Sequence, residues 1–239
     1  MSLKYNFFGE KAIIIDLKNI INNKISIAWK AELCLSLKKE FNEIVEDVVF
    51  SSFEITIFFK FVTVKSQKKN IINWIKSFNL KKQNISRNIW EIPACFDKTF
   101  SNDILVQKKY NLIAYETYIS EFLKCKFEAH HYGFLPGFLY LSGLPLKNHL
   151  PRKPSPEKSI YPGTIAVGES NVGIYPQVSP GGWNRIGRTR CSLFNRKINP
   201  PCYVLPGDKI KFISISLSEY QNNINKPVVP KSSSFEISL

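Results

Sequence analysis

The segment GFLPGFLYLSGLP, residues 133–145, opens the part of the chain that decides the fold. Ten of the 11 glycines and 11 of the 14 prolines lie between Gly133 and Gly207. Because these two residue types supply the backbone angles of tight turns, a segment rich in both changes direction often. We therefore expect short strands here, at 126–132, 163–167, 172–175, 202–205 and 209–216. Many short strands separated by turn signals are typical of a closed or partly closed β-barrel.

The first 90 residues differ from this region, because they contain a single glycine, Gly9, and no proline. Apolar spacing and β-branched content predict strands at 11–17, 46–50, 53–64 and 87–95, and helices at 25–41 and 67–79. The order β-α-β-β-α-β is that of a ferredoxin-like layer. A further helix is expected over 102–124, with Ser101 or Asn102 as its N-cap. The sequence thus predicts an α+β domain over 1–88, a mainly-β barrel domain over 89–220 and a C-terminal tail over 221–239.

Composition narrows the class of protein. The 239 residues are 44% apolar and 13% aromatic, which excludes a disordered chain, and no apolar run is long enough for a transmembrane helix. The net charge of +14 is spread, since residues 1–90 hold 15 basic and 8 acidic side chains and residues 91–239 hold 18 and 11. No nucleic-acid-binding signature accompanies this charge, so we expect neither nucleic acid nor a membrane as partner. The sequence at the start lacks the apolar run of a secretory signal, which favours a cytoplasmic protein.

Cysteine and histidine patterns do not predict a metal site. The five cysteines form no CxxC pair and read as reduced thiols packed as small hydrophobic groups. His130 and His131 are adjacent and would face opposite sides of a strand, and no third ligand accompanies them. Phosphate loops, dinucleotide fingerprints and nucleophile elbows are also missing. We expect a ligand groove whose catalytic residues cannot be assigned from the sequence.

The candidate ligand groove centres on SPGGWNRIGRT, residues 179–189. Gly181 and Gly182 permit positive φ and a close approach of backbone N–H groups to a ligand, and Trp183 offers a flat stacking face. The same residues also suit a tight barrel turn with Trp183 in the core. Five of the six arginines lie between 152 and 196. Because an arginine fork fits a carboxylate or phosphate, Arg188 is the anion-binding residue that we favour.

Aromatic residues in two other segments complete the predicted groove. The turn at Pro136–Gly137 ends in Phe138, and Tyr140 adds a hydroxyl close to an apolar wall. SNVGIYP, residues 170–176, contributes Tyr175.

Four segments occur in a fixed order: GFLPGFLYLSGLP (133–145), SNVGIYP (170–176), SPGGWNRIGRT (179–189) and PPCYVLPGDKIKF (200–212). Together they resemble the family of 5-oxoprolinase B subunits, also named allophanate hydrolase subunit 1 or KipI-type kinase inhibitor. FGEKAIIIDL (8–17) and WEIPACFD (90–97) fit its weaker N-terminal pattern. The resemblance covers nearly the whole chain and implies an α+β domain followed by a cyclophilin-like β-barrel.

By this resemblance, the chain is the B subunit of an ATP-dependent 5-oxoprolinase, which opens 5-oxo-L-proline to L-glutamate. The partners implied are the 5-oxoprolinase C subunit, a homologous barrel, and the A subunit, and we expect this chain alone to be inactive. ATP would act in the complex at a place that is not assigned, and neither metal nor biotin is expected on this chain. The residues expected to bind a small anionic or amide substrate are Arg152, Arg188, Gly181, Gly182, Trp183, Phe138, Tyr140 and Tyr175. Two alternatives stay open: a KipI-type inhibitor of a sensor histidine kinase, and the carboxyltransferase half of an allophanate or urea-type amide system.

The sequence departs from the family pattern at four places. Glu157 stands where a second arginine of a PR…PR element is expected, Asn171–Val172 replaces Gln-Thr, and Arg190 replaces a proline. Phe122 aligns with a histidine. The changes at Glu157 and Phe122 fall on groups that could contact a ligand, so the substrate is left open.

Overall fold

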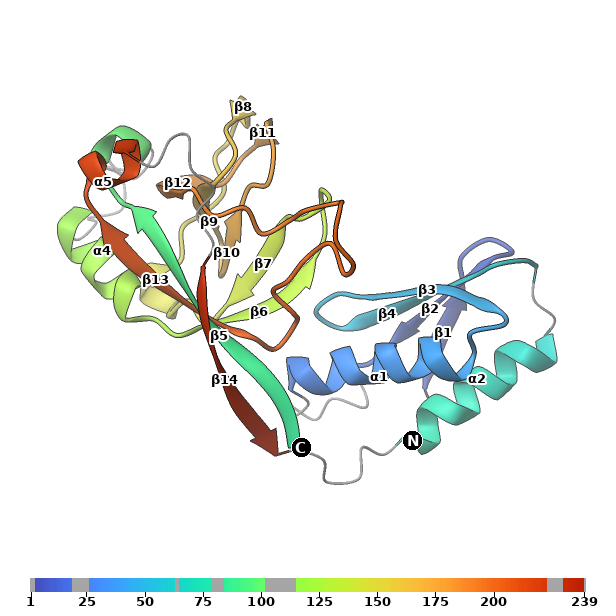
Figure 1. Cartoon of the computed structure of the whole chain (residues 1–239). Helices are drawn as coiled ribbons and strands as arrows, with labels where there is room; N and C mark the ends of the chain where they lie inside the picture. The colour runs from blue at the N-terminus through green and yellow to red at the C-terminus, as the bar shows by residue number, and fades with distance from the viewer. Residues whose placement is uncertain are drawn as a thin grey trace. The chain divides into compact units, whose positions relative to one another are not determined.

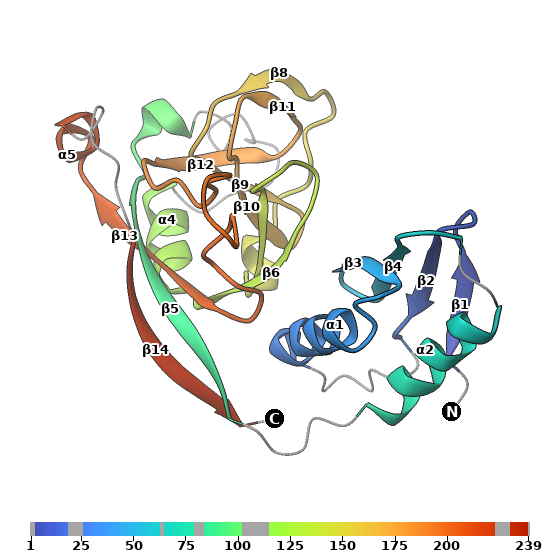
Figure 2. The same cartoon turned by 45° about the vertical axis from the view of Figure 1, so that its right-hand side comes forward.

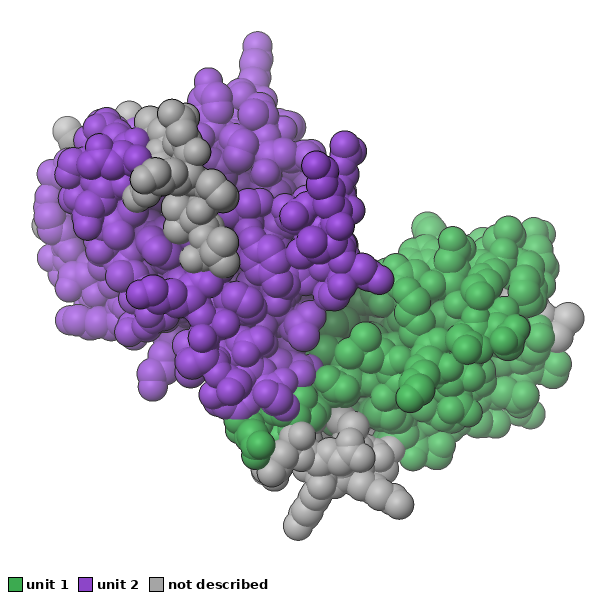
Figure 3. All heavy atoms as spheres, viewed as in Figure 1, with its two compact units in different colours: residues 1–85, 236–239 green, residues 86–235 purple. Residues whose placement is uncertain are grey.

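The computed structural model describes residues 3–18, 26–62, 65–78, 84–101, 115–222 and 230–238. The chain divides into two compact units, residues 1–85 with 236–239 and residues 86–235, which Figure 3 draws in different colours. Each unit has its own hydrophobic core. The domain boundary placed at residue 88 lies within strand β5 (Asn84–Cys95).

The first unit is a four-stranded antiparallel sheet with two helices on one face (Figure 2). Its elements are β1 (Lys4–Phe7), β2 (Ala12–Asp16), α1 (Ile27–Glu40), β3 (Val45–Phe50), β4 (Glu54–Phe59) and α2 (Lys65–Ser77). Ser26 caps α1, because its side chain accepts a hydrogen bond from the Trp29 amide at 3.1 Å. Alternate residues of β2 and β4, among them Ile13 and Ile57, are fully buried against the helices.

The predicted β-α-β-β-α-β order is wrong at both ends of this unit. The sheet order is β1-β2-β4-β3, and its outer strand β1 precedes the strand at 12–16 that we expected to come first. The strand expected at 87–95 exists as β5, but it pairs with barrel strands instead. A strand sequence predicts an extended conformation and a buried face, whereas the choice of sheet depends on partners distant in the chain.

The second unit is a closed barrel of seven strands (Figure 1). Around the barrel the strands run β12 (Asn184–Thr189), β9 (Thr164–Gly168), β10 (Asn171–Ile174), β7 (Leu139–Ser142), β6 (Phe127–Tyr132), β13 (Lys209–Ile215) and β5. Pairing of β12 with β5, at Arg188↔Cys95, closes the ring. All neighbours are antiparallel except β13 and β5. The predicted barrel is confirmed, although residues 202–205 form an isolated bridge at Cys202 instead of a strand.

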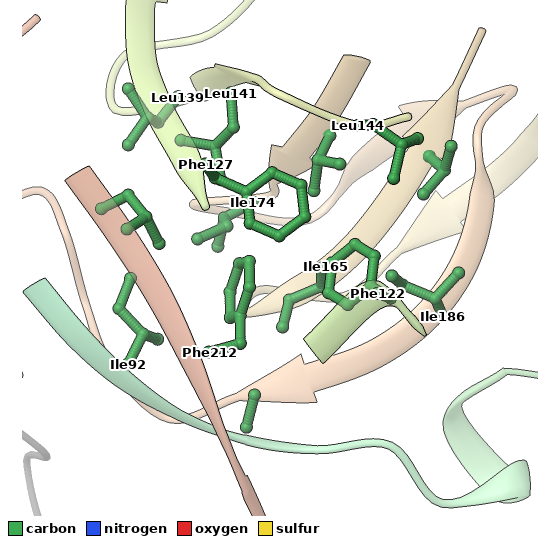
Figure 4. Close-up of a cluster of buried hydrophobic side chains, with 14 of the residues drawn as sticks. Ile92, Phe122, Phe127, Leu139, Leu141, Leu144, Ile165, Ile174, Ile186 and Phe212 are labelled. Atoms are coloured by element: carbon green, nitrogen blue, oxygen red, sulfur yellow. The ribbon is translucent and has the colours of Figure 1, made fainter. Parts of the chain in front are cut away.

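Helix α4 (Tyr115–Lys124) packs its apolar side into the barrel core. The Phe122 ring packs at a tilt against the rings of Phe127 and Phe212, whose centroids are 4.8 and 5.5 Å away. Figure 4 shows these rings among aliphatic side chains from the surrounding strands. Residues 115–124 thus confirm part of the helix predicted over 102–124, and the rest of that prediction lies outside the described residues.

Smaller elements lie outside the ring of barrel strands. A two-stranded ribbon of β8 (Glu157–Ile160) and β11 (Ser179–Gly181) projects from one end, as Figures 1 and 2 show. The remaining elements of the described residues are the 3₁₀ helices η1 (Lys98–Phe100) and η3 (Leu146–Asn148), the short helix α5 (Leu217–Asn222) and strand β14 (Lys231–Ser238). Because β14 pairs with β5, the prediction of a loose tail is wrong for residues 231–238.

The fully buried Asp208 joins three segments of the barrel unit. Its carboxylate accepts hydrogen bonds from the Asn88 amide at 2.9 Å, from Trp90 Nε1 at 2.8 Å and from the Leu205 amide at 2.8 Å. Three donors satisfy a carboxylate that would otherwise be costly to bury. The turn that enters β13 is thereby fixed to β5.

None of the helices that the structure describes has the length and apolar character needed to cross a membrane.

Candidate functional site

A cavity of about 390 Å³ is lined by residues of β7, β11 and the segments that connect the barrel strands. We call it the aromatic cavity. It is lined by Phe134, Phe138, Tyr140, Arg152, Lys153, Pro154, Pro156, Tyr175, Pro180, Gly181, Gly182 and Trp183. Seven of the eight predicted substrate-binding residues therefore line one cavity, with Arg188 the exception. Its volume lies within the usual range for small-molecule sites.

The walls of this cavity are aromatic rings packed edge to face. The Phe138 ring lies at the centre, with centroids 4.9 Å from Tyr140, 5.0 Å from Tyr175 and 5.7 Å from Trp183. All three pairs are T-shaped, an arrangement that aromatic quadrupoles favour. Trp183 is 6% exposed and lines the cavity, so it serves as part of the core and as a wall at once.

Glycines allow the rings to approach the strands this closely. At Gly173 in β10, an added Cβ would lie 2.5 Å from Phe138 Cζ and 2.9 Å from Trp183 Cζ3. A Cβ added at Gly181 would likewise collide with the Tyr175 hydroxyl and with the Ile160 side chain. The expected positive φ at Gly181 and Gly182 is wrong, because neither glycine adopts it. Gly181 instead belongs to strand β11, opposite Glu157, and its role is to leave room for a side chain.

The cationic side of the cavity is a loop that hydrogen bonds hold against the barrel. Asn184 Nδ2 donates to the Pro151 carbonyl at 2.7 Å, and the Lys153 amide donates to the Gly182 carbonyl at 2.8 Å. Arg152 Cζ lies 5.9 Å from the centre of the Trp183 ring. Its Nε is 3.5 Å from the carboxylate of Glu169, and both side chains are well exposed. Such a pair is weak, so a bound anion can compete with Glu169 for the guanidinium.

Lys153 contacts the cavity as well, although no sequence signal predicted it. Its ammonium group pairs with Glu157, and Arg185 Nη2 approaches the same carboxylate at 3.2 Å. Glu157, one of the departures from the family pattern, therefore neutralises part of the positive charge beside the cavity. In a chain with 27 lysines, nothing but its place next to Arg152 in PRKP distinguishes this residue.

Two tyrosine hydroxyls supply neutral hydrogen-bond donors. Burial raises the pKa of Tyr140, and the Arg152 guanidinium acts against this. Burial, with smaller effects from Tyr140 and Glu157, raises the pKa of Tyr175 to about 12. Both hydroxyls therefore keep their protons at neutral pH and can donate to a carbonyl or carboxylate oxygen.

Chemically, the described lining offers cationic, hydroxyl and aromatic groups but no carboxylate or imidazole base. Among the residues that the structure describes, the lining contains no aspartate, glutamate, histidine, serine or cysteine. Behind Tyr140, His131 stacks on its ring with centroids 4.5 Å apart, and His131 Nδ1 lies 2.7 Å from His130 Nδ1. Over the described ranges, no group of three or more His, Cys, Asp or Glu side chains is arranged to hold a metal ion.

Arg188 lies in a second cavity, of about 260 Å³, which we call the Arg188 cavity. Tyr175 lines both cavities. The structure therefore does not bring Arg188 together with Gly181 and Gly182 in one cavity. Arg152 is the arginine that lines the same cavity as Gly181 and Gly182.

Of the other departures from the family pattern, Arg190 lines the Arg188 cavity, whereas Phe122 and Asn171 lie away from both cavities. Phe122 is fully buried in the barrel core, so the expectation that this position contacts a ligand is wrong. Asn171 begins β10, opposite Gly168, and lines neither cavity.

Fold and motifs together define a class of protein. The sequence pattern of the family "carboxyltransferase domain, subdomain C and D" matches residues 3–204, and the chain belongs to this family. The resemblance drawn from the four motifs is thus confirmed.

The chain is similar to proteins named as 5-oxoprolinase B subunits. It is 36% identical to the one from Bacillus subtilis over 136 residues, which make up 57% of this chain and 57% of that relative. It is 34% identical to the protein of the same name in Haemophilus influenzae over 123 residues, which make up 52% of this chain and 58% of that relative. The matched region spans little more than half the length of these relatives.

Solved structures agree on the fold. A conserved protein of Pyrococcus horikoshii matches 91% of this chain and its own entire length, with 28% identity and a TM-score of 0.52. The urea carboxylase of Kluyveromyces lactis matches 98% of this chain over 24% of its own length, with 14% identity and a TM-score of 0.75. At that identity the second likeness concerns the fold alone.

Proposed function

We propose that this chain is the B subunit of an ATP-dependent 5-oxoprolinase, and that its aromatic cavity binds 5-oxo-L-proline. The observation that carries the proposal is the composition of that cavity. It combines an exposed guanidinium, two neutral tyrosine hydroxyls and a wall of rings. The relatives that are named as 5-oxoprolinase B subunits, at 36% and 34% identity, support the same function.

The substrate offers a group for each part of the cavity. It is a small five-membered lactam with one carboxylate. Arg152 would bind the carboxylate through its fork in place of Glu169. Tyr140 or Tyr175 would donate to the lactam carbonyl oxygen, where negative charge develops when the ring opens. Trp183 and Phe138 would enclose the ring and exclude water.

The missing base explains the need for partners. A lactam is a poor electrophile, and ATP supplies the activation of its carbonyl in the complex. This chain would hold and orient the lactam, while the A and C subunits provide the remaining groups. On this proposal the assembly acts in the cytoplasm, and the barrel is of the cyclophilin-like type.

The test is co-expression of this chain with the A and C subunits of the same organism. We expect ATP-dependent release of glutamate from 5-oxo-L-proline by the complex and no release by the chain alone. Arg152→Gln in the complex should raise the KM for 5-oxo-L-proline about 10- to 150-fold, because a charge-assisted hydrogen bond contributes about 1.5–3 kcal/mol. Arg196→Gln, at an exposed arginine outside the cavity, is the matched control.

Three results would reject the proposal. Absence of glutamate release by the full complex would exclude the activity. Loss of activity on addition of avidin would favour the carboxyltransferase alternative. Capture of a sensor histidine kinase without the A and C subunits would favour the inhibitor alternative.

A further inference from the structure

The Arg188 cavity has a chemistry different from that of the aromatic cavity. The polar residues of its lining are Arg188, Arg190, Thr189, Ser192 and Tyr220. Among the described residues, no aspartate or glutamate lines it. Two guanidinium groups without a carboxylate in the same small space make it a strongly positive cavity.

Arg188 is held in place from two sides. Its Nε donates to the Pro162 carbonyl at 3.0 Å, and its guanidinium lies 5.4 Å from the centre of the Tyr161 ring and 5.9 Å from that of Phe100. One donor and the stacking contacts fix the plane of the group. Within residues 84–101 and 115–222, no carboxylate forms an ion pair with it.

Arg190 and Tyr220 carry the stronger observation. Arg190 Cζ lies 4.1 Å from the centre of the Tyr220 ring, and Tyr220 is only 2% exposed. The Nε of Arg190 and the hydroxyl of Tyr220 are both buried, and neither has a hydrogen-bond partner in the part of the chain that the structure describes. Buried polar groups are nearly always paired, so these two atoms, on residues that line one cavity, lack a partner that the described residues do not supply.

We propose that the Arg188 cavity binds a phosphate group, with Arg188, Arg190 and the Tyr220 hydroxyl as donors. A phosphate has enough oxygens to accept from two guanidinium forks and a hydroxyl at once. The volume of about 260 Å³ is below the usual size of a site for a whole organic ligand. The occupant is therefore inorganic phosphate or the phosphate end of a larger molecule.

This site is separate from the one proposed for the lactam. The substrate carboxylate is assigned to Arg152 in the aromatic cavity, and the two cavities meet at Tyr175. Burial raises the pKa of Tyr220 while the two guanidinium groups lower it, and the hydroxyl remains a donor at neutral pH. A phosphate here would lie on the other side of Tyr175 from the lactam.

The experiment titrates the isolated full-length chain with sodium phosphate by calorimetry, against sodium chloride of equal ionic strength. We expect saturable binding of phosphate by the wild-type chain. Arg190→Gln should weaken it about 10-fold or more, as the loss of a charge-assisted hydrogen bond requires. Arg196→Gln should bind like wild type, because Arg196 is exposed outside the cavity.

The variant Tyr220→Phe distinguishes a role of the hydroxyl in phosphate binding from a role in the stability of the fold. With no partner for the hydroxyl in the described residues, its removal should leave the melting temperature of the phosphate-free chain unchanged or raised, while phosphate binding weakens about 10-fold. A lower melting temperature without any change in phosphate binding would overturn the proposal.

Parallel titrations with ADP and ATP identify the source of the phosphate. Equal affinity for phosphate and ATP indicates the free ion, whereas tighter ATP binding that Arg190→Gln abolishes indicates the end of a nucleotide. Either result supports the site. Absence of saturable binding of all three, or equal binding by Arg190→Gln and Arg196→Gln, would refute it. The titrations use this chain without its partners, so their outcome is independent of whether the complex releases glutamate.

Discussion

Gly173→Ala is the substitution that most directly tests the packing of the aromatic cavity. Gly173 lies in β10 between Ala166 and Tyr140 of the neighbouring strands. An added methyl group would lie 2.5 Å from Phe138 Cζ and 2.9 Å from Trp183 Cζ3, too close for either contact to persist. Both rings are almost fully buried, so the strand or the rings must shift.

The expected cost follows from overpacking. Forcing a methyl group into a filled core costs about 1–3 kcal/mol. For a domain of this size, that lowers the melting temperature by about 2–12 °C. The same shift displaces two walls of the cavity, so under the proposed function the assembled enzyme should also have a higher KM for 5-oxo-L-proline. Urea unfolding and glutamate release measure the two effects separately.

Gly182→Ala is the matched control. A Cβ at Gly182 would have no neighbour nearer than 3.8 Å, and its φ is not in the left-handed region. Its stability should match that of wild type or exceed it slightly, since alanine restricts the unfolded chain. If Gly173→Ala unfolded at the same urea concentration as Gly182→Ala, the close packing of Phe138 and Trp183 on β10 would be refuted.

Three other predictions concern charge and polarity. Arg152→Asp should abolish the binding of 5-oxo-L-proline to the complex, because it replaces the guanidinium with a repelling carboxylate; unchanged binding by calorimetry would contradict the assigned role. Burial raises the pKa of Tyr175 from 10.0 to about 12, so its protonated hydroxyl stabilises the folded chain fully below pH 10, and this contribution is lost as the pH rises through 12. The stability of Tyr175→Phe should therefore fall less steeply than that of wild type as the pH rises. If circular dichroism from pH 9 to 12 showed the same loss of structure in both proteins, this expectation would be wrong. Asp208→Ala should reduce the free energy of unfolding by about 3 kcal/mol or more, since three donors lose their acceptor; a urea midpoint equal to that of wild type would show that water replaces the carboxylate.

The barrel could be predicted from local signals. Glycine and proline mark its turns, and alternating apolar residues mark strands such as the one at 209–215. Strand β1 was missed because KYNF is only 4 residues long, and its aromatic residues Tyr5 and Phe7 are exposed instead of buried in the core. The sheet to which β5 belongs could not be predicted, because its partner β13 lies more than 100 residues later in the sequence.

The site was predicted in its residue types more accurately than in its geometry. The residues of the aromatic and glycine motifs line one cavity, and Gly173 and Gly181 leave room there for the neighbouring rings. That these residues bind a substrate stays a prediction. The arginine that accompanies them could not be chosen from the sequence. Arg188 and Arg152 have equal chemistry, and the loop that carries Arg152 is held at the cavity by hydrogen bonds with Asn184 and Gly182, which no local sequence pattern predicts.

The parallel pairing of β5 with β13 also has a consequence for biosynthesis. The register joins Ile89 to Lys209, so the ring cannot close until the second of these residues has left the ribosome. At typical rates of translation, β5 would wait several seconds or longer for β13, and during this time its apolar side chains and strand edge would be exposed. A chaperone that shields nascent chains should therefore associate with ribosomes during this interval and leave once Ile215 emerges.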